Sequence, residues 1–267
     1  MTNNIVIVRG GGDIATGSIQ KLHRTGYRVL VLEREAPQCI RRFVTCAEAM
    51  YTGFFQVEDL SIQRIDNLSE AESVWAAGRI PIIADESGAS IQALKPLAVV
   101  DGILAKTNLG TRRDMAKIVI GLGPGFIAGK DVHVVIETNR GHNLGRLIFS
   151  GAPEANTGNP GDILGFTTER ILRSSNTGTI DVIHDLGAVV KKGDVVATVD
   201  GVPIYSQLDG MVRGMIRHGS HVKDGMKVGD VDPRVNKKNL TTISDKARAI
   251  GGGVLEALLM LQRAFQL

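Results

Sequence analysis

The sequence predicts an α/β protein in which an all-β domain at residues 161–233 is inserted between a parallel-sheet domain at 1–160 and a linker and helix at 234–267. Three observations predict this arrangement. A strand, a glycine turn and a helix open the chain, a repeat of glycine-bounded strands fills part of its second half, and an amphipathic helical pattern ends it. Hydrophobic residues make up 43% of the 267 residues and charged residues 22%, as in an ordinary globular protein.

The first domain begins with a strand, because residues 5–9 (IVIVR) are mainly β-branched. Gly10, Gly12 and Ala15 then form the pattern GxGxxA ahead of a helical segment, and a second apolar strand ends at Glu33 about twenty residues on. This combination is typical of the βαβ unit that binds dinucleotides. We therefore expect a Rossmann-like parallel sheet.

The glycine turn is the first candidate binding site. Glycines there would let backbone amides approach a phosphate at the helix N-terminus, and Glu33 would accept a ribose hydroxyl. A second glycine loop at 121–125 is either another anion nest or a long turn between strands. Asp13 would repel a phosphate unless it turns away to cap the helix. The predicted cofactor-binding residues are Gly10, Gly11, Gly12, Asp13, Ala15, Glu33, Gly123 and Gly125.

Polar stretches at 106–114 and 133–142 follow or end later strands of the same predicted sheet. Ligands of open α/β sheets bind where the strands end, so an anion could be received there by cationic side chains and a carboxylate or imidazole could serve as general base. Each of these residues also has an ordinary explanation as a turn, capping or salt-bridge residue. The predicted catalytic residues are Lys106, Glu137, Arg140 and His142.

The second domain is indicated by an internal repeat. Residues 178–199 and 210–231 match at a constant offset of 32, with paired glycines and a shared V-K-x-G turn. The pattern resembles the barrel-sandwich hybrid of biotinyl and lipoyl carrier domains. A carrier has a modifiable lysine at the hairpin tip, whereas this chain has Asp200 and Gly201 there. We therefore expect the carrier fold without the carrier chemistry.

The chain ends in a predicted helix that begins at Ser244, a favourable N-cap residue. Its apolar stripe is interrupted by three consecutive glycines, 251–253, each of which costs roughly 1 kcal/mol in a helix relative to alanine. Such a cost predicts close packing against another backbone. We expect this C-terminal helix to pack back on the first domain.

Composition narrows the classes of partner. The net charge is +3, but basic and acidic residues are interspersed and only 4% of residues are aromatic, so we expect no nucleic-acid partner. No apolar run reaches the ~18–20 residues of a membrane span and the N-terminus has no leader pattern, so we expect a cytoplasmic protein. Cys39 and Cys46 fit reduced thiols, which leaves a sulfur- or selenium-carrying role open, and no metal-ligand spacing is present.

Five segments together closely resemble the YqeB-like family of accessory proteins in the selenium-dependent molybdenum hydroxylase system. They are 8–17, 105–116, 121–146, 228–234 and 244–258. The resemblance implies a maturation factor for an enzyme of the xanthine dehydrogenase type. It also implies the apo-hydroxylase and other maturation factors as partners. The cofactor candidates are the molybdenum pterin cofactor and NAD(P).

Two alternatives stay open. The chain could be an independent NAD(P)-dependent oxidoreductase, or a chaperone that holds the apo-hydroxylase without catalysing a reaction. The sequence leaves open whether the chain is an enzyme and is compatible with a homo-oligomer.

Overall fold

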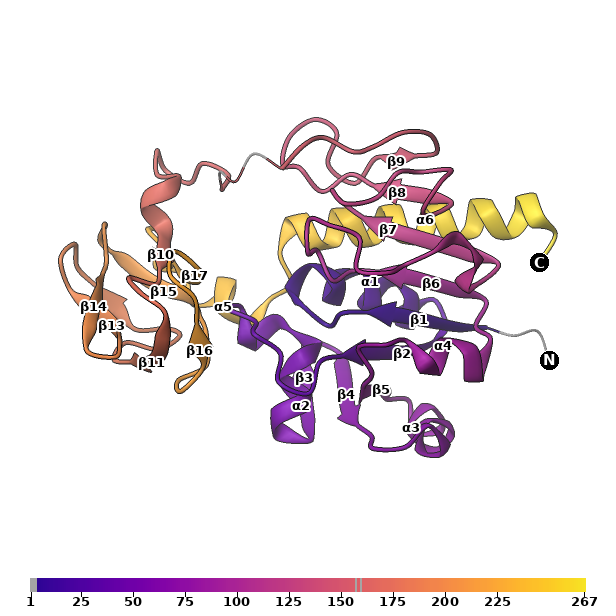
Figure 1. Cartoon of the computed structure of the whole chain (residues 1–267), viewed down its shortest axis with the longest axis horizontal. Helices are drawn as coiled ribbons and strands as arrows, with labels where there is room; N and C mark the ends of the chain where they lie inside the picture. The colour runs from indigo at the N-terminus through magenta and orange to yellow at the C-terminus, as the bar shows by residue number, and fades with distance from the viewer. Residues whose placement is uncertain (1–3, 157, 159) are drawn as a thin grey trace. The chain divides into compact units, whose positions relative to one another are not determined.

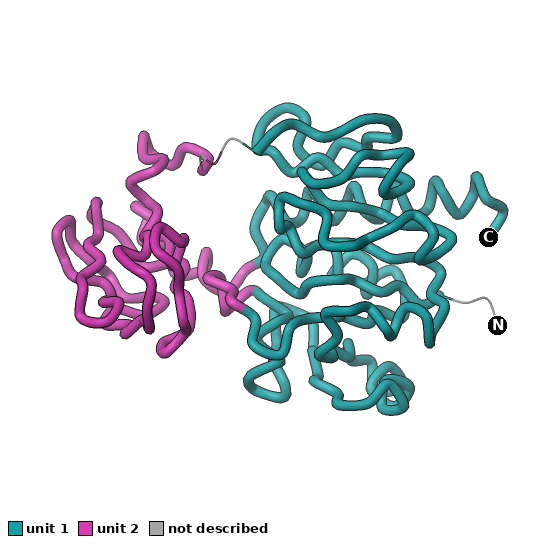
Figure 2. The backbone as a smooth tube through the Cα atoms, in the orientation of Figure 1, with its two compact units in different colours: residues 1–37, 45–156, 243–267 teal, residues 38–44, 157–242 magenta. Residues whose placement is uncertain are grey.

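The computed structural model describes residues 4–156, 158 and 160–267, and the chain divides into two compact units (Figure 2). Unit 1 comprises residues 1–37, 45–156 and 243–267, and unit 2 comprises residues 38–44 and 157–242. Unit 2 thus takes in a short segment that follows the second strand of the chain.

Unit 1 is built on one nine-stranded sheet with the order β3-β4-β5-β2-β1-β6-β7-β8-β9 (Figure 1). Neighbouring strands from β4 to β8 pair in parallel. The two outermost pairs, β3 with β4 and β8 with β9, are antiparallel. The strands are β1 (Ile5–Arg9), β2 (Arg28–Glu33), β3 (Phe54–Val57), β4 (Leu60–Arg64), β5 (Ile80–Ala84), β6 (Ala98–Asp101), β7 (Ile118–Leu122), β8 (Val134–Ile136) and β9 (Leu147–Ile148).

The expected fold class, a Rossmann-like parallel sheet with an inserted barrel-sandwich hybrid, is wrong. The sheet is mixed, because hairpins close both of its edges. A doubly wound sheet also carries α-helices on its crossovers, whereas the connections from β6 to β7 and from β7 to β8 contain one 3₁₀ turn, Arg113–Met115, and no α-helix. Glycine-rich loops make these connections instead. In the sequence, these loops separate successive strands by distances that resemble those of helical crossovers.

Short helices complete unit 1. They are α2 (Ala49–Thr52), α3 (Ala71–Ala76) and α4 (Ala89–Leu94), with 3₁₀ turns at Cys46–Glu48 and Leu68–Glu70. The buried strands read as continuous apolar runs, as expected where both faces of a sheet are covered. No helix in the described part of the chain is long and apolar enough to cross a membrane.

The C-terminal helix α6 (Asp245–Phe265) packs against α1 (Asp13–Arg24) within unit 1. A side chain at Gly17 would overlap the carbonyl oxygen of Ala247, and one at Gly251 would overlap the carbonyl oxygen of Gly17. The two helices therefore touch backbone to backbone. This contact explains why a costly glycine stands in the middle of α6.

Unit 2 contains two four-stranded antiparallel sheets with the orders β10-β17-β15-β12 and β14-β13-β11-β16. One buried apolar cluster draws on all eight strands. The elements of unit 2 are β10 (Ile171–Arg173), β11 (Gly178–Val182), β12 (Val189–Val190), β13 (Val195–Val199), β14 (Val202–Tyr205), β15 (Gly210–Met215), β16 (His221–Val222), β17 (Lys227–Asp232) and α5 (Lys238–Thr241), with 3₁₀ turns at Arg42–Val44 and Thr168–Arg170.

The internal repeat is confirmed at the level of strands. β15, β16 and β17 begin 32 residues after β11, β12 and β13, respectively. The two copies exchange partners, since β11 pairs with β16 and β15 pairs with β12. Neither copy can therefore bury its strands without the other.

Candidate functional site

The candidate site lies at the carboxyl edge of the parallel strands of unit 1. Parallel strands end at the same edge, which is where open α/β sheets bind ligands. Six of these strands end there in a charged residue or directly precede one. These residues are Arg9 of β1, Glu33 of β2, Arg64 of β4, Asp85 after β5, Asp101 of β6 and Glu137 after β8.

The glycine turn between β1 and α1 is mostly filled by the protein itself. Gly10 has φ +88°, and a Cβ atom there would stand 3.0 Å from the backbone of Ile103. A Cβ atom on Gly11 would stand 3.0 Å from the amide nitrogen of Ala47. At Gly12, the N-cap of α1, a Cβ atom would meet nothing within 4 Å. Of these three glycines, only the N-cap residue Gly12 has open space at its Cβ position.

Glu33 is engaged by the same turn. Its Oε2 accepts the amide hydrogen of Gly11 at 2.7 Å, and its Oε1 accepts that of Arg34 at 2.9 Å. Ala15, buried in α1, packs so closely that a Cβ atom on Gly102 would stand 2.8 Å from its methyl group. Ala15, the small residue of the GxGxxA pattern, therefore allows α1 to pack closely against Gly102.

A buried polar group follows β1 and β6. The Arg9 guanidinium lies 3.5 Å from Asp101 and also hydrogen bonds to the Thr111 hydroxyl, which donates to Asp101. Asp101 further accepts the amide hydrogen of Ile103 at 3.1 Å. These contacts connect the end of β6 to Ile103 and Thr111 in the loop that follows it. Lys106, a predicted catalytic residue in this loop, is exposed and has a left-handed φ of +65°.

The second glycine loop is also packed. Gly123 (φ +71°) leaves no room for a side chain beside Thr138, and Gly125 (φ +113°) lies against the backbone of Thr107. The loops after β6 and β7 therefore contact each other. Packing and backbone conformation account for both glycines without a bound anion.

The loop after β8 is organised by Glu137, which is buried. Its Oε1 accepts the amide hydrogen of Asn139 at 2.6 Å and its Oε2 accepts that of Glu154 at 2.8 Å. Because both oxygens hold backbone amides, Glu137 is placed to position the loop rather than to accept a substrate proton. His142, further along, is exposed.

Arg140 connects this loop to the start of α6. Its guanidinium donates to both carboxylate oxygens of Asp245, at 2.7 and 3.1 Å. The hydrogen bond from Arg140 holds the pKa of Asp245 well below its usual range. The pair is half exposed, so its contribution to stability is modest.

Lys246, in the first turn of α6, is the group that sequence reasoning missed. Burial lowers the pKa of its ammonium group, and the nearby charge of Arg140 lowers it further. The carboxylates of Asp13, Glu137 and Asp245 act in the opposite direction without reversing the shift. An amine with a lowered pKa is a better nucleophile or general base near neutral pH. These charges come together where the N-termini of α1 and α6 meet the end of β8.

Sequence signals for the missed residues were weak. Arg9 and Asp101 each end a buried apolar strand, where an unpaired charge would be costly, and this could have indicated a pair. Lys246 stands in an ordinary helix start, and only the fold brings it to the end of β8.

A separate pocket of about 850 Å³ opens in unit 1 at the amino ends of the strands. Asn4, Leu97 and Lys117, which precede β1, β6 and β7, line it together with Gln262 of α6 and Leu267, which follows that helix. None of the predicted site residues lines this pocket. It is distinct from the carboxyl edge.

Among the described residues, no group of three or more His, Cys, Asp or Glu side chains is placed to hold a metal ion. Cys46 is fully buried, and burial raises the pKa of its thiol to about 12. Cys39 is half-buried in unit 2.

Fold and site define a two-unit α/β and all-β protein with charged residues gathered at the carboxyl edge of a mixed sheet. Over 259 residues, 97% of the chain, it is 49% identical to YqeB of Escherichia coli (strain K12), a protein described as uncharacterized. The similarity to YqeB expected from the sequence is confirmed. The match covers 48% of that relative, so the chain spans about half its length.

Other comparisons add little. No protein-family model matches the chain. Similar solved structures include the ectoine utilization protein EutE (DoeB) of Ruegeria pomeroyi, at 13% identity over 86% of this chain and 85% of that one, with a TM-score of 0.26. An aspartoacylase family protein of Mesorhizobium loti is 12% identical over 86% and 85% of the two chains, with a TM-score of 0.27. TM-scores of this size assign neither fold nor activity to this chain.

Proposed function

We propose that the chain is a maturation factor for a selenium-dependent molybdenum hydroxylase and binds a phosphate-bearing ligand at the N-terminus of α1. The ligand would be a nucleotide or the molybdenum pterin cofactor. The role rests on the sequence resemblance, and the binding site rests on the geometry of unit 1. The activity of the longer YqeB protein is itself part of the proposal.

The open space at Gly12 carries the binding proposal. The N-terminus of a helix attracts anions through its unpaired amides and its dipole. Close packing explains the glycines at positions 10 and 11. At Gly12, neither packing nor the φ of −64° requires a glycine. An absent side chain at this position would leave a phosphate room to approach the first amides of α1.

Lys246 supports the same location. It shares its surroundings with Asp13, which is in the first turn of α1. We expect the ammonium group to bind a ligand phosphate, and the carboxylates around it to keep it oriented when no ligand is bound. An anion beside Lys246 would raise its pKa again, which couples ligand binding to proton uptake.

The alternative of an NAD(P)-dependent oxidoreductase fits less well. A dinucleotide site uses the acid at the end of the second strand to bind a ribose hydroxyl. Both oxygens of Glu33 already accept backbone amides. A phosphate fits this end of the sheet better than the adenosine ribose of NAD.

The test compares Gly12→Asp with Gly12→Asn. Both residues are favourable N-caps, so neither variant should disturb α1, and they differ only in charge. Calorimetry of the full chain with ATP, NAD and the molybdenum pterin cofactor should show binding of at least one of them. We expect Asp to weaken that binding about tenfold or more and Asn to weaken it far less. Equal binding by the two variants, or no binding to any probe, would contradict the proposed site.

The chaperone alternative is separated by a second measurement. It predicts capture of the apo-hydroxylase that is unaffected by Gly12→Asp and Lys106→Ala. A maturation factor whose ligand matters should lose hydroxylase activation in the Gly12→Asp variant. Mass spectrometry of any small molecule that copurifies with the chain would identify the ligand class directly.

A further inference from the structure

The pocket of about 850 Å³ at the amino ends of the strands is a feature of unit 1 that the proposed function does not use. Its walls come from α4 with the residues on either side of it, from the loop before β7 and from the end of α6. The start of β1 and the end of α6 lie on the same side of unit 1 (Figure 1). Pockets of about 300–1,000 Å³ are typical of small-molecule sites.

Apolar side chains form part of the pocket wall. Ile91 of α4 and Leu97 before β6 are core residues, only 3% and 7% exposed, and both line the pocket. Pro96 and Met115 line it as well. A ligand with an apolar body would gain free energy by covering these side chains.

Two cationic side chains of the loop before β7 have unused hydrogen-bond donors. The ammonium group of Lys117 forms no hydrogen bond or ion pair with any residue that the structure describes. Arg112 donates from Nε to Asp114 at 3.1 Å, and its two terminal nitrogens have no acceptor within the described ranges. The edge that these two nitrogens form matches the two oxygens of a carboxylate. An anion can therefore bind here while Arg112 keeps its bond to Asp114.

Two amide side chains of the pocket are held by the turn after α1. Gln262 Oε1 accepts the hydroxyl hydrogen of Tyr27 at 2.5 Å, and burial raises the pKa of Tyr27, which keeps this hydroxyl protonated. Asn4 Nδ2 donates to the carbonyl oxygen of Gly26 at 3.2 Å. Each amide is thus fixed through one of its atoms. The N–H groups of Gln262 and the Oδ1 atom of Asn4 have no partner in the described part of the chain.

The backbone of the pocket wall is strained beside α4. Lys95, the C-cap residue of this helix, has φ +45° and ψ +61°, in the left-handed region. Glycine adopts this conformation with less strain and is the usual residue at the end of a helix. Strained residues are concentrated at ligand-binding sites. Here a cationic residue that lines the pocket stands at such a position.

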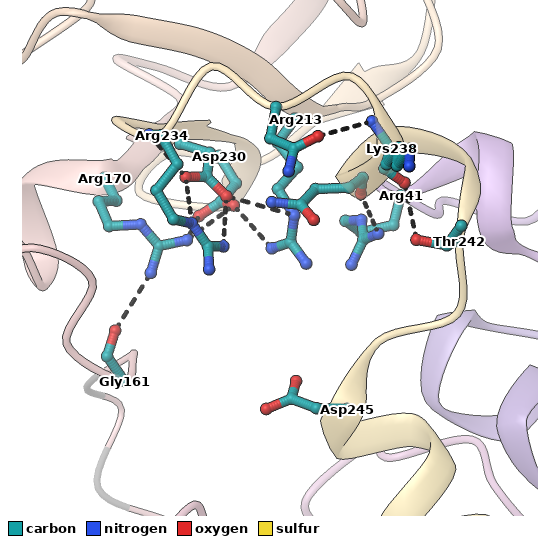
Figure 3. A network of polar contacts seen from close by, with 12 residues as sticks. Arg41, Gly161, Arg170, Arg213, Asp230, Arg234, Lys238, Thr242 and Asp245 are labelled. Carbon is teal, nitrogen blue, oxygen red and sulfur yellow. Dashed lines mark hydrogen bonds and ion pairs between the residues drawn. The ribbon is translucent and has the colours of Figure 1, made fainter.

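A network of arginines in unit 2 shows the opposite condition (Figure 3). Arg170 Nη2 donates to both carboxylate oxygens of Asp230, at 3.1 and 3.0 Å, and Arg213 Nη1 donates to one of them at 3.5 Å. These guanidinium groups already bind a carboxylate of their own unit and serve the fold. The ammonium group of Lys117 and the terminal nitrogens of Arg112 have no such partner among the described residues.

We propose that the pocket at the amino ends of the strands binds a small organic acid, with its carboxylate on Lys117 and Arg112 and its apolar body on Ile91 and Leu97. The free donors match a carboxylate, and the apolar wall favours an organic body over an inorganic anion. The carboxylate of Asp114 beside Arg112 repels a phosphate dianion more strongly than a carboxylate monoanion.

Calorimetry of the full chain with four probes at constant ionic strength tests the proposal. 2-Naphthoate has a carboxylate and an apolar body, 2-naphthamide has the same ring without the charge, acetate has the charge without the ring, and 2-naphthyl phosphate has a dianion. The variants are Lys117→Gln, Lys117→Arg and Arg112→Gln. Lys130→Gln is the matched control, because Lys130 is an exposed lysine of unit 1 that does not line the pocket.

We expect 2-naphthoate to bind at least about tenfold more tightly than the other three probes. Lys117→Gln and Arg112→Gln should weaken its binding about tenfold or more, Lys117→Arg should largely keep it, and Lys130→Gln should leave it unchanged. Gly12→Asp should also leave it unchanged, which separates this site from the one at the N-terminus of α1.

Three results would overturn the proposal. The first is a wild-type chain that does not bind 2-naphthoate. The second is binding of 2-naphthamide or 2-naphthyl phosphate that is as tight as that of 2-naphthoate. The third is a folded Lys117→Gln variant that binds 2-naphthoate as well as Lys130→Gln does.

Discussion

Glu33 holds the amide of Gly11 through a 2.7 Å hydrogen bond, and this contact ties the end of β2 to the turn that follows β1. The first prediction concerns this contact. Glu33→Gln removes the charge that strengthens the hydrogen bond and should lower the free energy of unfolding by roughly 1–2 kcal/mol. Urea denaturation measures the change.

Glu35→Gln is the matched control for this experiment. Glu35 lies two residues away and forms an exposed ion pair with Arg64 at 2.7 Å, which contributes at most about 1 kcal/mol. If both variants lose the same small amount of stability, Glu33 does not hold the turn. NAD should protect the wild type no more than Glu33→Gln, since backbone amides already occupy both carboxylate oxygens of Glu33 in the wild type.

The second prediction concerns the triple glycine of α6. Gly251→Ala places a methyl group against the carbonyl oxygen of Gly17, so α1 and α6 must move apart, and we expect a loss of roughly 2–4 kcal/mol. Gly252, one residue on, has open space at its Cβ position. Gly252→Ala should therefore stabilise the helix by up to about 1 kcal/mol. Thermal unfolding of both variants checks the opposite signs, and a loss of stability in both would contradict the backbone contact.

Local patterns explain which features of the fold could be predicted. The start of α6 was readable because Ser244 accepts the amide hydrogen of Ala247 three residues on, within one turn. The repeat was readable because paired glycines occupy equivalent positions in the two copies, at the starts of β11 and β15 and in the turns that follow them. The edge hairpin of β8 and β9 could not be predicted, since β9 is only two residues long.

Long-range contacts explain what the sequence missed in the site. The sequence correctly placed Glu33 at a strand end, but its partner Gly11 is 22 residues away. The same pattern fits an acid that binds a ribose hydroxyl and an acid that binds this backbone amide. Lys246 reaches the charges of Asp13 and Glu137 only through the packing of α6 on α1. Charged residues far apart in sequence give no periodic signal.

The third prediction separates the two cysteines. The thiolate is the reactive form, and burial raises the pKa of the Cys46 thiol to about 12, so Cys46 should not react in the folded chain. A disulfide reagent at pH 8 should modify Cys39 alone in the native state and both thiols after denaturation. Cys39→Ser should abolish the native reaction and Cys46→Ser should preserve it. Rapid native labelling of Cys46 would restore it as a candidate sulfur or selenium carrier.

The fourth prediction follows from the lowered pKa of Lys246. In the window between that lowered pKa and the value of about 10.4 in an unfolded chain, the unfolded state binds a proton that the folded state does not. The contribution of Lys246 to the free energy of unfolding therefore rises with pH across this window. Denaturation at several pH values should show that Lys246→Gln loses this rise. Lys191→Gln, which removes the same charge from an exposed ion pair with Asp209, should retain it. If the two variants keep the same pH dependence, Lys246 is not held in a desolvated state at the carboxyl edge, and its proposed contact with a ligand phosphate loses its physical basis.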